Sequence, residues 1–270
     1  MGELRFQLAL YRRLVGAKLR SDWQYRTSFI LLFLSSAVAA GLDLAVIAVI
    51  FGQVDGLAGW SVVEVALLYG ISGISFGLAD VFASQAEYAS RHIKAGTFDR
   101  FLLRPVWPLL QLSATEFAFR RFGRMLQAGL VLAIALSKAD VDWSLGRAAM
   151  VPLAIASGAV LFGAIWVITS SLSFWTVETQ EVANAFTYGG CQLAQYPLEI
   201  MGRWLRRVAT FLVPLAFAAY FPVAYVLGKP EPMGAPSAVA FLAPAVAVAV
   251  ALVSRAVWGT AVRHYRSTGS

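Results

Sequence analysis

The most constraining feature of this chain is a run of 30 residues, 148–177, that contains no charged side chain. A helix needs about 20 mainly apolar residues to cross the hydrocarbon core of a bilayer, so this run is long enough to span one. Overall, 59% of the residues are hydrophobic and 14% are charged, whereas soluble domains have about 25% charged residues. This composition excludes a soluble enzyme, a disordered chain or a disulfide scaffold. It predicts an all-α polytopic membrane protein.

Further apolar runs predict more membrane spans. They lie at about 28–51, 60–82, 117–136 and 235–258. Within the second of these runs, Gly73 and Gly77 have the spacing of small residues that lets another helix approach closely. We therefore expect a helix to pack on this face.

Positive charges orient the predicted spans. Sixteen Lys and Arg residues lie before the first span, between 91 and 124, or after residue 254, whereas Lys138, Arg147 and Lys229 fall on the opposite side if the spans alternate. Cytoplasmic segments carry an excess of Lys and Arg, so both termini are predicted to be cytoplasmic. The net charge of +7 then reflects topology, and no nucleic-acid partner is expected. Two cytoplasmic termini need an even number of crossings, and six is the natural count.

Two further apolar runs, 182–198 and 208–227, leave two topologies open at this stage. In one, 182–198 is cytoplasmic and 208–227 is the fifth span, which keeps Arg203, Arg206 and Arg207 inside, as the charge rule favours. In the other, 182–198 crosses and 208–227 dips back as a broken, re-entrant segment. Pro214 and Pro222 suit that second topology, because non-helical backbone at depth is tolerated when it is buried in protein.

The N-terminal residues 1–24 predict an amphipathic interfacial helix on the cytoplasmic leaflet. Their apolar side chains follow one helical stripe, and most of the arginines lie off it. The remaining residues, 25–270, are predicted to form a single transmembrane domain. The stripe consists of Leu4, Leu8, Tyr11, Val15 and Leu19.

The loop 83–116 is the longest hydrophilic stretch and mixes basic with apolar side chains. Gly96 is expected to end one short helix, and Thr97 to cap the next, with Asp99 in its first turn. Arg104–Pro105 is expected to end that second helix, because the residue before a proline avoids helical geometry. A loop needed only for orientation would not require these apolar groups. The mixture therefore predicts docking against a protein or lipid headgroups.

The chain contains no motif that predicts catalysis. It has no phosphate-binding loop of the G-x-x-x-x-G-K-[ST] type and no H-E-x-x-H or G-x-S-x-G motif. With one cysteine, Cys191, and two histidines, a structural zinc site is not expected. We therefore expect no catalytic residue, cofactor or metal in this chain, and any energy must be supplied elsewhere.

Two acidic residues within the predicted spans, Asp43 and Asp80, are candidates for a translocation path, since ionisable groups in a membrane are functional by default. They support an alternative hypothesis, a proton-coupled secondary transporter. An internal inverted repeat would favour that alternative, and we find none. A membrane enzyme has less support, because no nucleophile–base arrangement is present.

The segment RHIKAGTFDRFLLRP, Arg91–Pro105, resembles the I-x-x-G-x-x-D-x-x-L-x-x-P cytoplasmic loop of ABC-2 type permeases, the membrane subunits of ATP-binding cassette exporters. The stretches Ala183–Gly228 and Arg263–Ser270 are similar to an actinobacterial-style branch of six-span permeases. The resemblance covers essentially the whole chain.

The resemblance implies six spans, with the fifth at 181–198, and a re-entrant extracellular element at about 200–227 between spans five and six. It also implies that the cytoplasmic loop 83–116 docks on a separate ATPase, which binds the ATP and magnesium. The residues that it assigns to this coupling loop are Arg91, His92, Lys94, Gly96, Asp99, Arg100, Leu103, Arg104 and Pro105.

The function implied is that of a permease subunit in the cell membrane. It would couple ATP hydrolysis by the partner to export of a small amphipathic compound, such as a drug, an antibiotic or a lipid-like molecule. One chain has about half the spans of such an exporter, so it is expected to pair with itself or with a second ABC-2 permease. The first and fifth spans are the expected seam, and membrane lipid surrounds the assembly.

Overall fold

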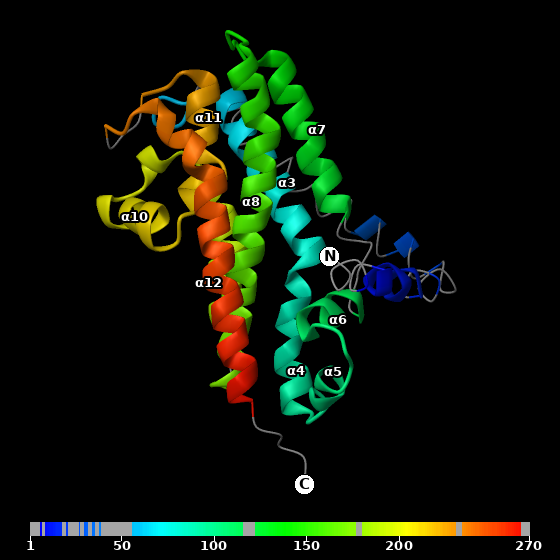
Figure 1. Ribbon diagram of the computed structural model, residues 1–270. Coiled ribbons are helices and arrows are strands. Elements are labelled where there is room, and N and C mark those ends of the chain that lie inside the picture. The colour runs from blue at the N-terminus through cyan, green and yellow to red at the C-terminus, as the bar shows by residue number, and fades with distance from the viewer. Residues whose placement is uncertain are drawn as a thin grey trace.

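The computed structural model describes residues 56–115, 122–176, 180–230 and 234–265, together with some of residues 6–38. In these residues the chain is helical and contains no β-strand (Figure 1). Most of the first predicted span, 28–51, lies outside the described residues, and so does Asp43. Both remain predictions.

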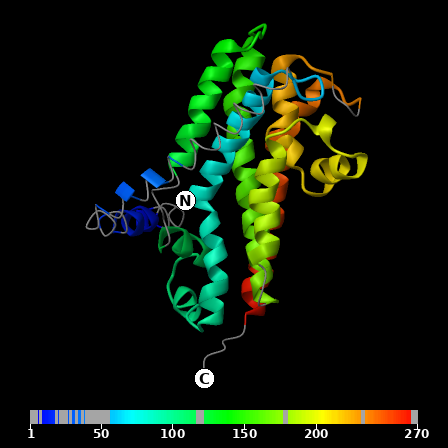
Figure 2. The same ribbon diagram turned by 180° about the vertical axis from the view of Figure 1, so that it is seen from behind.

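Four long helices form the body of the molecule. They are α3 (Val62–Phe82), α7 (Phe122–Lys138), α8 (Leu145–Ser171) and α12 (Ala243–His264). They lie side by side in the order α7, α3, α8, α12 (Figures 1 and 2). Helix α3 is central and buries most of its side chains, whereas α12 is peripheral.

Three helical segments among the described residues are long and apolar enough to cross a membrane: Val62–Phe82, Leu145–Phe174 and Ser237–His264. Their bounds lie close to the predicted spans 60–82, 148–177 and 235–258. The start of α3 is fixed by a capping box, in which the Ser61 hydroxyl accepts from the Glu64 backbone N–H and the Glu64 carboxylate accepts from the Ser61 backbone N–H. Ser144 caps α8 in a similar way, by accepting from the Arg147 N–H.

Glycines on α3 allow α7 to approach closely. A Cβ atom built on Gly70 would lie 2.7 Å from the Leu132 Cβ, and one on Gly73 would lie 2.7 Å from the Ala128 Cβ. One on Gly77 would lie 3.0 Å from the Met125 Cβ. The predicted seat for a neighbouring helix at Gly73 and Gly77 is therefore confirmed, and α7 is the helix that occupies it.

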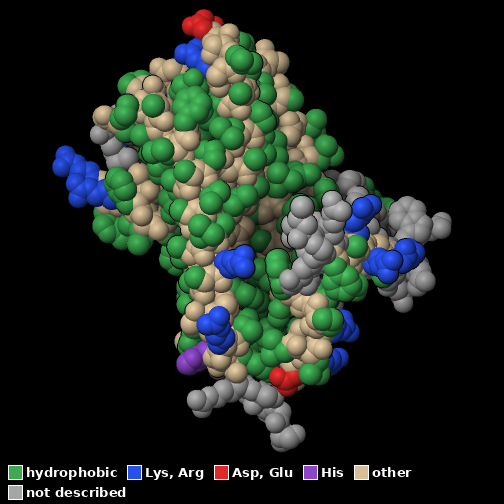
Figure 3. Space-filling model, viewed as in Figure 1, with side chains coloured by type: hydrophobic (Ala, Val, Ile, Leu, Met, Phe, Trp, Pro, Cys, Tyr) green, Lys and Arg blue, Asp and Glu red, His purple; other side chains and the backbone are tan. Residues whose placement is uncertain are grey.

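The molecule has two distinct ends. The lower end in Figure 1 holds the short helices of the 83–116 loop and the C-terminal end of α12. The upper end holds the start of α3, the connection between α7 and α8, and α11 (Tyr220–Leu227). On the face shown in Figure 3, most Lys and Arg side chains lie in the lower half.

The chain between α8 and α12 forms several short helices rather than one long one. Helix α9 (Gln180–Ala194) is followed by α10 (Arg203–Arg207), a π-helical turn at Val208–Leu212, and α11. Helix α11 has 8 residues, too few to cross a bilayer alone. Helix α10 lies at the side of the bundle, between its two ends (Figures 1 and 2).

Candidate functional site

The segment Arg91–Pro105 includes most of α4 (Ala89–Lys94) and all of α5 (Asp99–Leu102), two short helices joined by a tight turn at the lower end of the bundle. Gly96 is the residue that makes this turn, with a φ of 62°. Its N–H donates to the Ile93 carbonyl over 3.1 Å, and the Thr97 N–H donates to the His92 carbonyl over 2.9 Å. These two bonds form a Schellman motif, which needs a left-handed residue at the position of Gly96. The prediction that Gly96 ends a helix is confirmed.

Two details of this segment differ from the prediction. Thr97 does not cap α5, whose N-cap is Phe98 without a side-chain cap bond. Instead, the Thr97 hydroxyl lies 3.0 Å from Nδ1 of His92 and donates to the His92 carbonyl over 3.4 Å, so it closes the preceding helix. Helix α5 ends at Leu102 rather than at Arg104, although Asp99 does lie in its first turn as predicted.

An aromatic cluster anchors the turn to the bundle. Phe98 is fully buried, and its ring centroid lies 5.2 Å from that of Phe174 and 5.1 Å from that of Tyr265. Phe174 follows α8 directly, and Tyr265 caps α12, where Trp258 also contacts Phe174. The turn between α4 and α5 is therefore packed against the ends of both long helices.

Polar side chains reinforce this anchor. Nε2 of Gln111, on α6 (Pro108–Thr115), donates to the carbonyls of Phe101 and Val106 over 2.8 and 2.6 Å. The Ser113 hydroxyl donates to the Phe82 carbonyl at the end of α3 over 3.0 Å. Both side chains are buried, where a polar group without a hydrogen-bond partner is costly, so these bonds stabilise the packing of the segment.

A further bond links the start of the loop to α8. The indole Nε1 of Trp166 donates to the carboxylate of Glu87, which lies in the 3₁₀ turn Ser84–Tyr88 between α3 and α4. Trp166 is fully buried. The loop is thus tied to α3, α8 and α12.

The opposite face of the segment is exposed and cationic. Leu103 is 84% exposed, and His92 is partly buried against the Phe101 ring. The other predicted coupling residues on the exposed face are Arg91, Lys94, Arg100, Arg104 and Pro105. The nine predicted coupling residues therefore lie in a folded segment that has a buried aromatic side and an exposed cationic side.

Of the two candidate acids, only Asp80 lies among the described residues. Asp80 lies on α3, near its lower end, and is 5% exposed, while Asp43 lies outside the described set. A separate cavity of about 240 Å³ lies between α3, α7 and α9. It is lined by Tyr69, Arg124, Tyr188, Cys191 and Gln192 among others, and Asp80 is not one of its lining residues.

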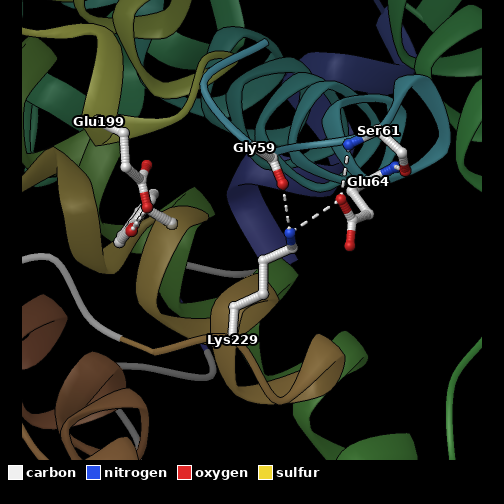
Figure 4. Close-up of polar contacts among 6 residues, drawn as sticks. Gly59, Ser61, Glu64, Glu199 and Lys229 are labelled. Carbon is white, nitrogen blue, oxygen red and sulfur yellow. Dashed lines mark hydrogen bonds and ion pairs between the residues drawn. The ribbon is translucent and has the colours of Figure 1, made fainter. Parts of the chain in front are cut away.

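At the upper end of the bundle, an ion pair joins the start of α3 to the chain that follows α11. Nζ of Lys229 lies 3.0 Å from the Glu64 carboxylate and donates to the Gly59 carbonyl over 2.8 Å (Figure 4). Glu64 is the same residue that completes the capping box with Ser61. Lys229, just after α11, and Glu64, at the start of α3, lie at the end of the bundle opposite Arg91–Pro105.

Arg206 has a structural role that the charge pattern did not indicate. Its guanidinium donates to the backbone carbonyls of Leu198, Glu199 and Met201 over 3.2, 3.4 and 3.3 Å. The Glu199 carboxylate in turn accepts from the Tyr220 hydroxyl over 2.6 Å, which joins this turn to α11. Arg206 therefore stabilises the turn between α9 and α10, whereas Arg203 and Arg207 are exposed.

Sequence reasoning missed the anchoring residues because it treated 83–116 as an exposed loop. The signal that could have identified two of them is the presence of Phe98 and Phe101 in a stretch that is otherwise hydrophilic. Their partners, such as Phe174, are about 75 residues away in the chain, and no local pattern identifies them.

Comparison with known proteins gives the family. The family model described as ABC-2 family transporter protein matches residues 37–269. No curated protein and no solved structure matches this chain. The match covers most of the chain and confirms the resemblance found at Arg91–Pro105. The chain therefore belongs to the ABC-2 transporter family, whose members are integral membrane permease subunits that work with an ATP-binding subunit.

Proposed function

We propose that this chain is the permease subunit of an exporter, and that a separate ATPase drives it through the segment Arg91–Pro105. The observation that carries the proposal is the two-sided construction of this segment. One side presents exposed cationic groups to a partner, and the other side buries Phe98 against α8 and α12. Such a segment is able to receive a force and transmit it to long helices.

Transmission requires two global states that differ in the contacts of the segment. The links described above lead to α3 through Ser113, to α8 through Phe174 and Trp166, and to α12 through Tyr265. Closure of the ATPase around ATP would therefore move these three helices together. The exposed arginines favour an acidic docking surface on the ATPase.

The topology we propose has six spans, cytoplasmic termini and a re-entrant extracellular element at 200–227. Support comes from the two ends of the bundle: Arg91–Pro105 and the end of α12 lie at one end, and Lys229 lies at the other. The break between α9 and α11 also favours this topology over a straight span at 208–227. Three bonds from Arg206 to carbonyls explain how an arginine is accommodated in that element.

The seam with a second permease subunit, either a copy of this chain or a different one, is proposed along the first and fifth spans. Helix α9, in the fifth predicted span, leaves large side chains exposed, including Val182, Phe186 and Tyr188. Such a surface is available for a partner helix or for lipid.

The proposed substrate is a small amphipathic compound. The cavity between α3, α7 and α9 supports this class, because it combines the aromatic rings of Tyr69 and Tyr188 with the polar groups of Arg124 and Gln192. Aromatic walls with a few polar groups are typical of small-molecule sites. At about 240 Å³ the cavity is slightly smaller than the usual range of about 300–1,000 Å³, so it would hold part of such a compound.

The test is reconstitution of the permease with its ATPase in vesicles. We expect transport that requires ATP, and we expect Arg100→Glu combined with Arg104→Glu to abolish both co-purification of the ATPase and transport. The matched control is Arg203→Glu with Arg207→Glu, which reverses two exposed arginines away from the segment and should retain both activities.

The competing function is proton-coupled transport, which the buried Asp80 favours. Transport by the permease alone, driven by a proton gradient and lost on Asp80→Asn, would establish that alternative and overturn the proposal. The topology is tested by cysteine labelling of intact cells in a Cys191→Ala background. Arg207→Cys should be labelled from outside and Arg100→Cys should be protected, whereas protection of both would favour a fifth span at 208–227.

A further inference from the structure

A second, larger groove runs along the lower part of α12. It lies between α12 and α6, with α8 beneath, and has a volume of about 540 Å³. Its walls are mainly apolar and include Val167 of α8, Ala251 and Val262 of α12, and Leu109 of α6. Figure 3 shows a hollow with hydrophobic side chains at this place, and Lys or Arg side chains along its α12 rim.

The rim carries two arginines on one stripe of α12. Arg255 and Arg263 both line the groove and are exposed, and they lie eight residues apart, which is about 12 Å of helix rise. No carboxylate lines the groove, and among the described residues neither arginine forms an ion pair. A groove that is apolar inside and cationic at its rim is complementary to an anion that carries a hydrocarbon chain.

The surroundings of the groove indicate that it opens to the membrane. The outward face of α12 next to it exposes Val248, Leu252 and Val253, as expected for a helix that faces lipid. Two tryptophans, Trp107 and Trp258, line the groove, and tryptophan is enriched where a membrane protein meets the lipid headgroups.

We propose that this groove binds one anionic phospholipid, with its phosphate between Arg255 and Arg263 and an acyl chain against α8 and α12. Basic pockets between helices on the cytoplasmic side bind such headgroups. The assignment of this lipid to the cytoplasmic leaflet rests on the topology proposed above, whereas the chemistry of lipid binding does not depend on it. The N-terminal segment is the competing occupant, yet its described residues 9–17 lie on the far side of α6 from α12 in both views (Figures 1 and 2).

The position of this lipid has a consequence for coupling. Trp107 lies two residues after Pro105, so the lipid contacts α12 and the chain that leaves the coupling segment at the same time. A lipid bound there would contribute to holding the segment against α12.

The test uses the full chain in vesicles that contain phosphatidylcholine and a trace of phosphatidylglycerol with a photoactivatable acyl chain. We expect adducts on residues 251–263 and 107–109, and competition by unlabelled phosphatidylglycerol far more than by phosphatidylcholine. Removal of one rim arginine should lower the affinity for phosphatidylglycerol roughly fivefold, so Arg255→Gln combined with Arg263→Gln should lower it roughly 25-fold. No ATPase or transport is needed, so a failure here is distinct from a failure of the proposed function.

Two further variants make the result specific. Gly259 lines the groove, and a Cβ atom on it would meet nothing within 4 Å, so Gly259→Phe places a ring in the groove without a change of charge and should abolish the adducts. The control Arg100→Gln with Arg104→Gln removes two exposed arginines outside the groove and should retain them.

Three results would overturn the assignment. The first is equal competition by the two lipids, and the second is an equal loss of adducts in the Arg100 and Arg104 control. The third is a disulfide between Gly259→Cys and Tyr11→Cys in the Cys191→Ala background, which would identify the N-terminal segment as the occupant. The double arginine variant, checked for monodispersity, keeps the proposal testable even if Gly259→Phe does not fold.

Discussion

Replacement of Phe98 by alanine tests whether the coupling segment is held by its aromatic anchor. The side chain is fully buried and contacts the rings of Phe174, Tyr265 and Phe101 at centroid distances of 5.2, 5.1 and 5.9 Å. Truncation of a buried phenylalanine costs about 3–5 kcal/mol, and part of this is the loss of ring–ring contacts. Because Phe174 directly follows α8 and Tyr265 caps α12, most of the cost falls on docking of the segment against these helices.

The assay is amide hydrogen exchange of the full chain in detergent or lipid. An energy of about 3–5 kcal/mol corresponds to roughly two to three and a half orders of magnitude in the opening equilibrium. We therefore expect exchange within residues 89–106 to accelerate by up to that factor in Phe98→Ala, while the centre of α3 keeps its protection. Leu103→Ala is the control, since this side chain is 84% exposed and should change little. Unaltered exchange of the segment in Phe98→Ala would refute the anchor.

Two further variants test packing elsewhere. Gly70→Ala should destabilise the protein by about 1–3 kcal/mol in thermal unfolding, because the new Cβ atom would lie 2.7 Å from the Cβ atom of Leu132. The control is Gly129→Ala on α7, whose new Cβ atom meets nothing within 4 Å, so this variant should be neutral or more stable. Equal melting temperatures of the two variants would contradict close α3–α7 packing. Arg206→Lys should cost about 1–3 kcal/mol and speed proteolysis at the turn before α10, because an ammonium cannot hold three carbonyls as a guanidinium does. Arg203→Lys, an exposed change, should leave both measurements as they are.

Features that depend on local sequence were predicted well. The three helices that are long and apolar enough to cross a membrane lie close to the predicted ranges, because hydrophobicity over about 20 residues acts on each segment separately. Gly96 was identified as a helix end because a left-handed residue is required there whatever surrounds it. The glycine pair on α3 was visible as spacing alone.

Features that depend on partners far along the chain were decided by the tertiary structure. Sequence alone placed Phe98 in an exposed loop, but its partners Phe174 and Tyr265, at the ends of α8 and α12, make it a buried anchor. Sequence patterns left both a straight span and a broken, re-entrant segment open at 208–227, and only the structure shows where the chain breaks and that Arg206 binds the backbone of the preceding turn. Local sequence patterns reflect the conformational and hydrophobic preferences of each residue, whereas its burial and hydrogen bonds depend on which other parts of the chain pack against it.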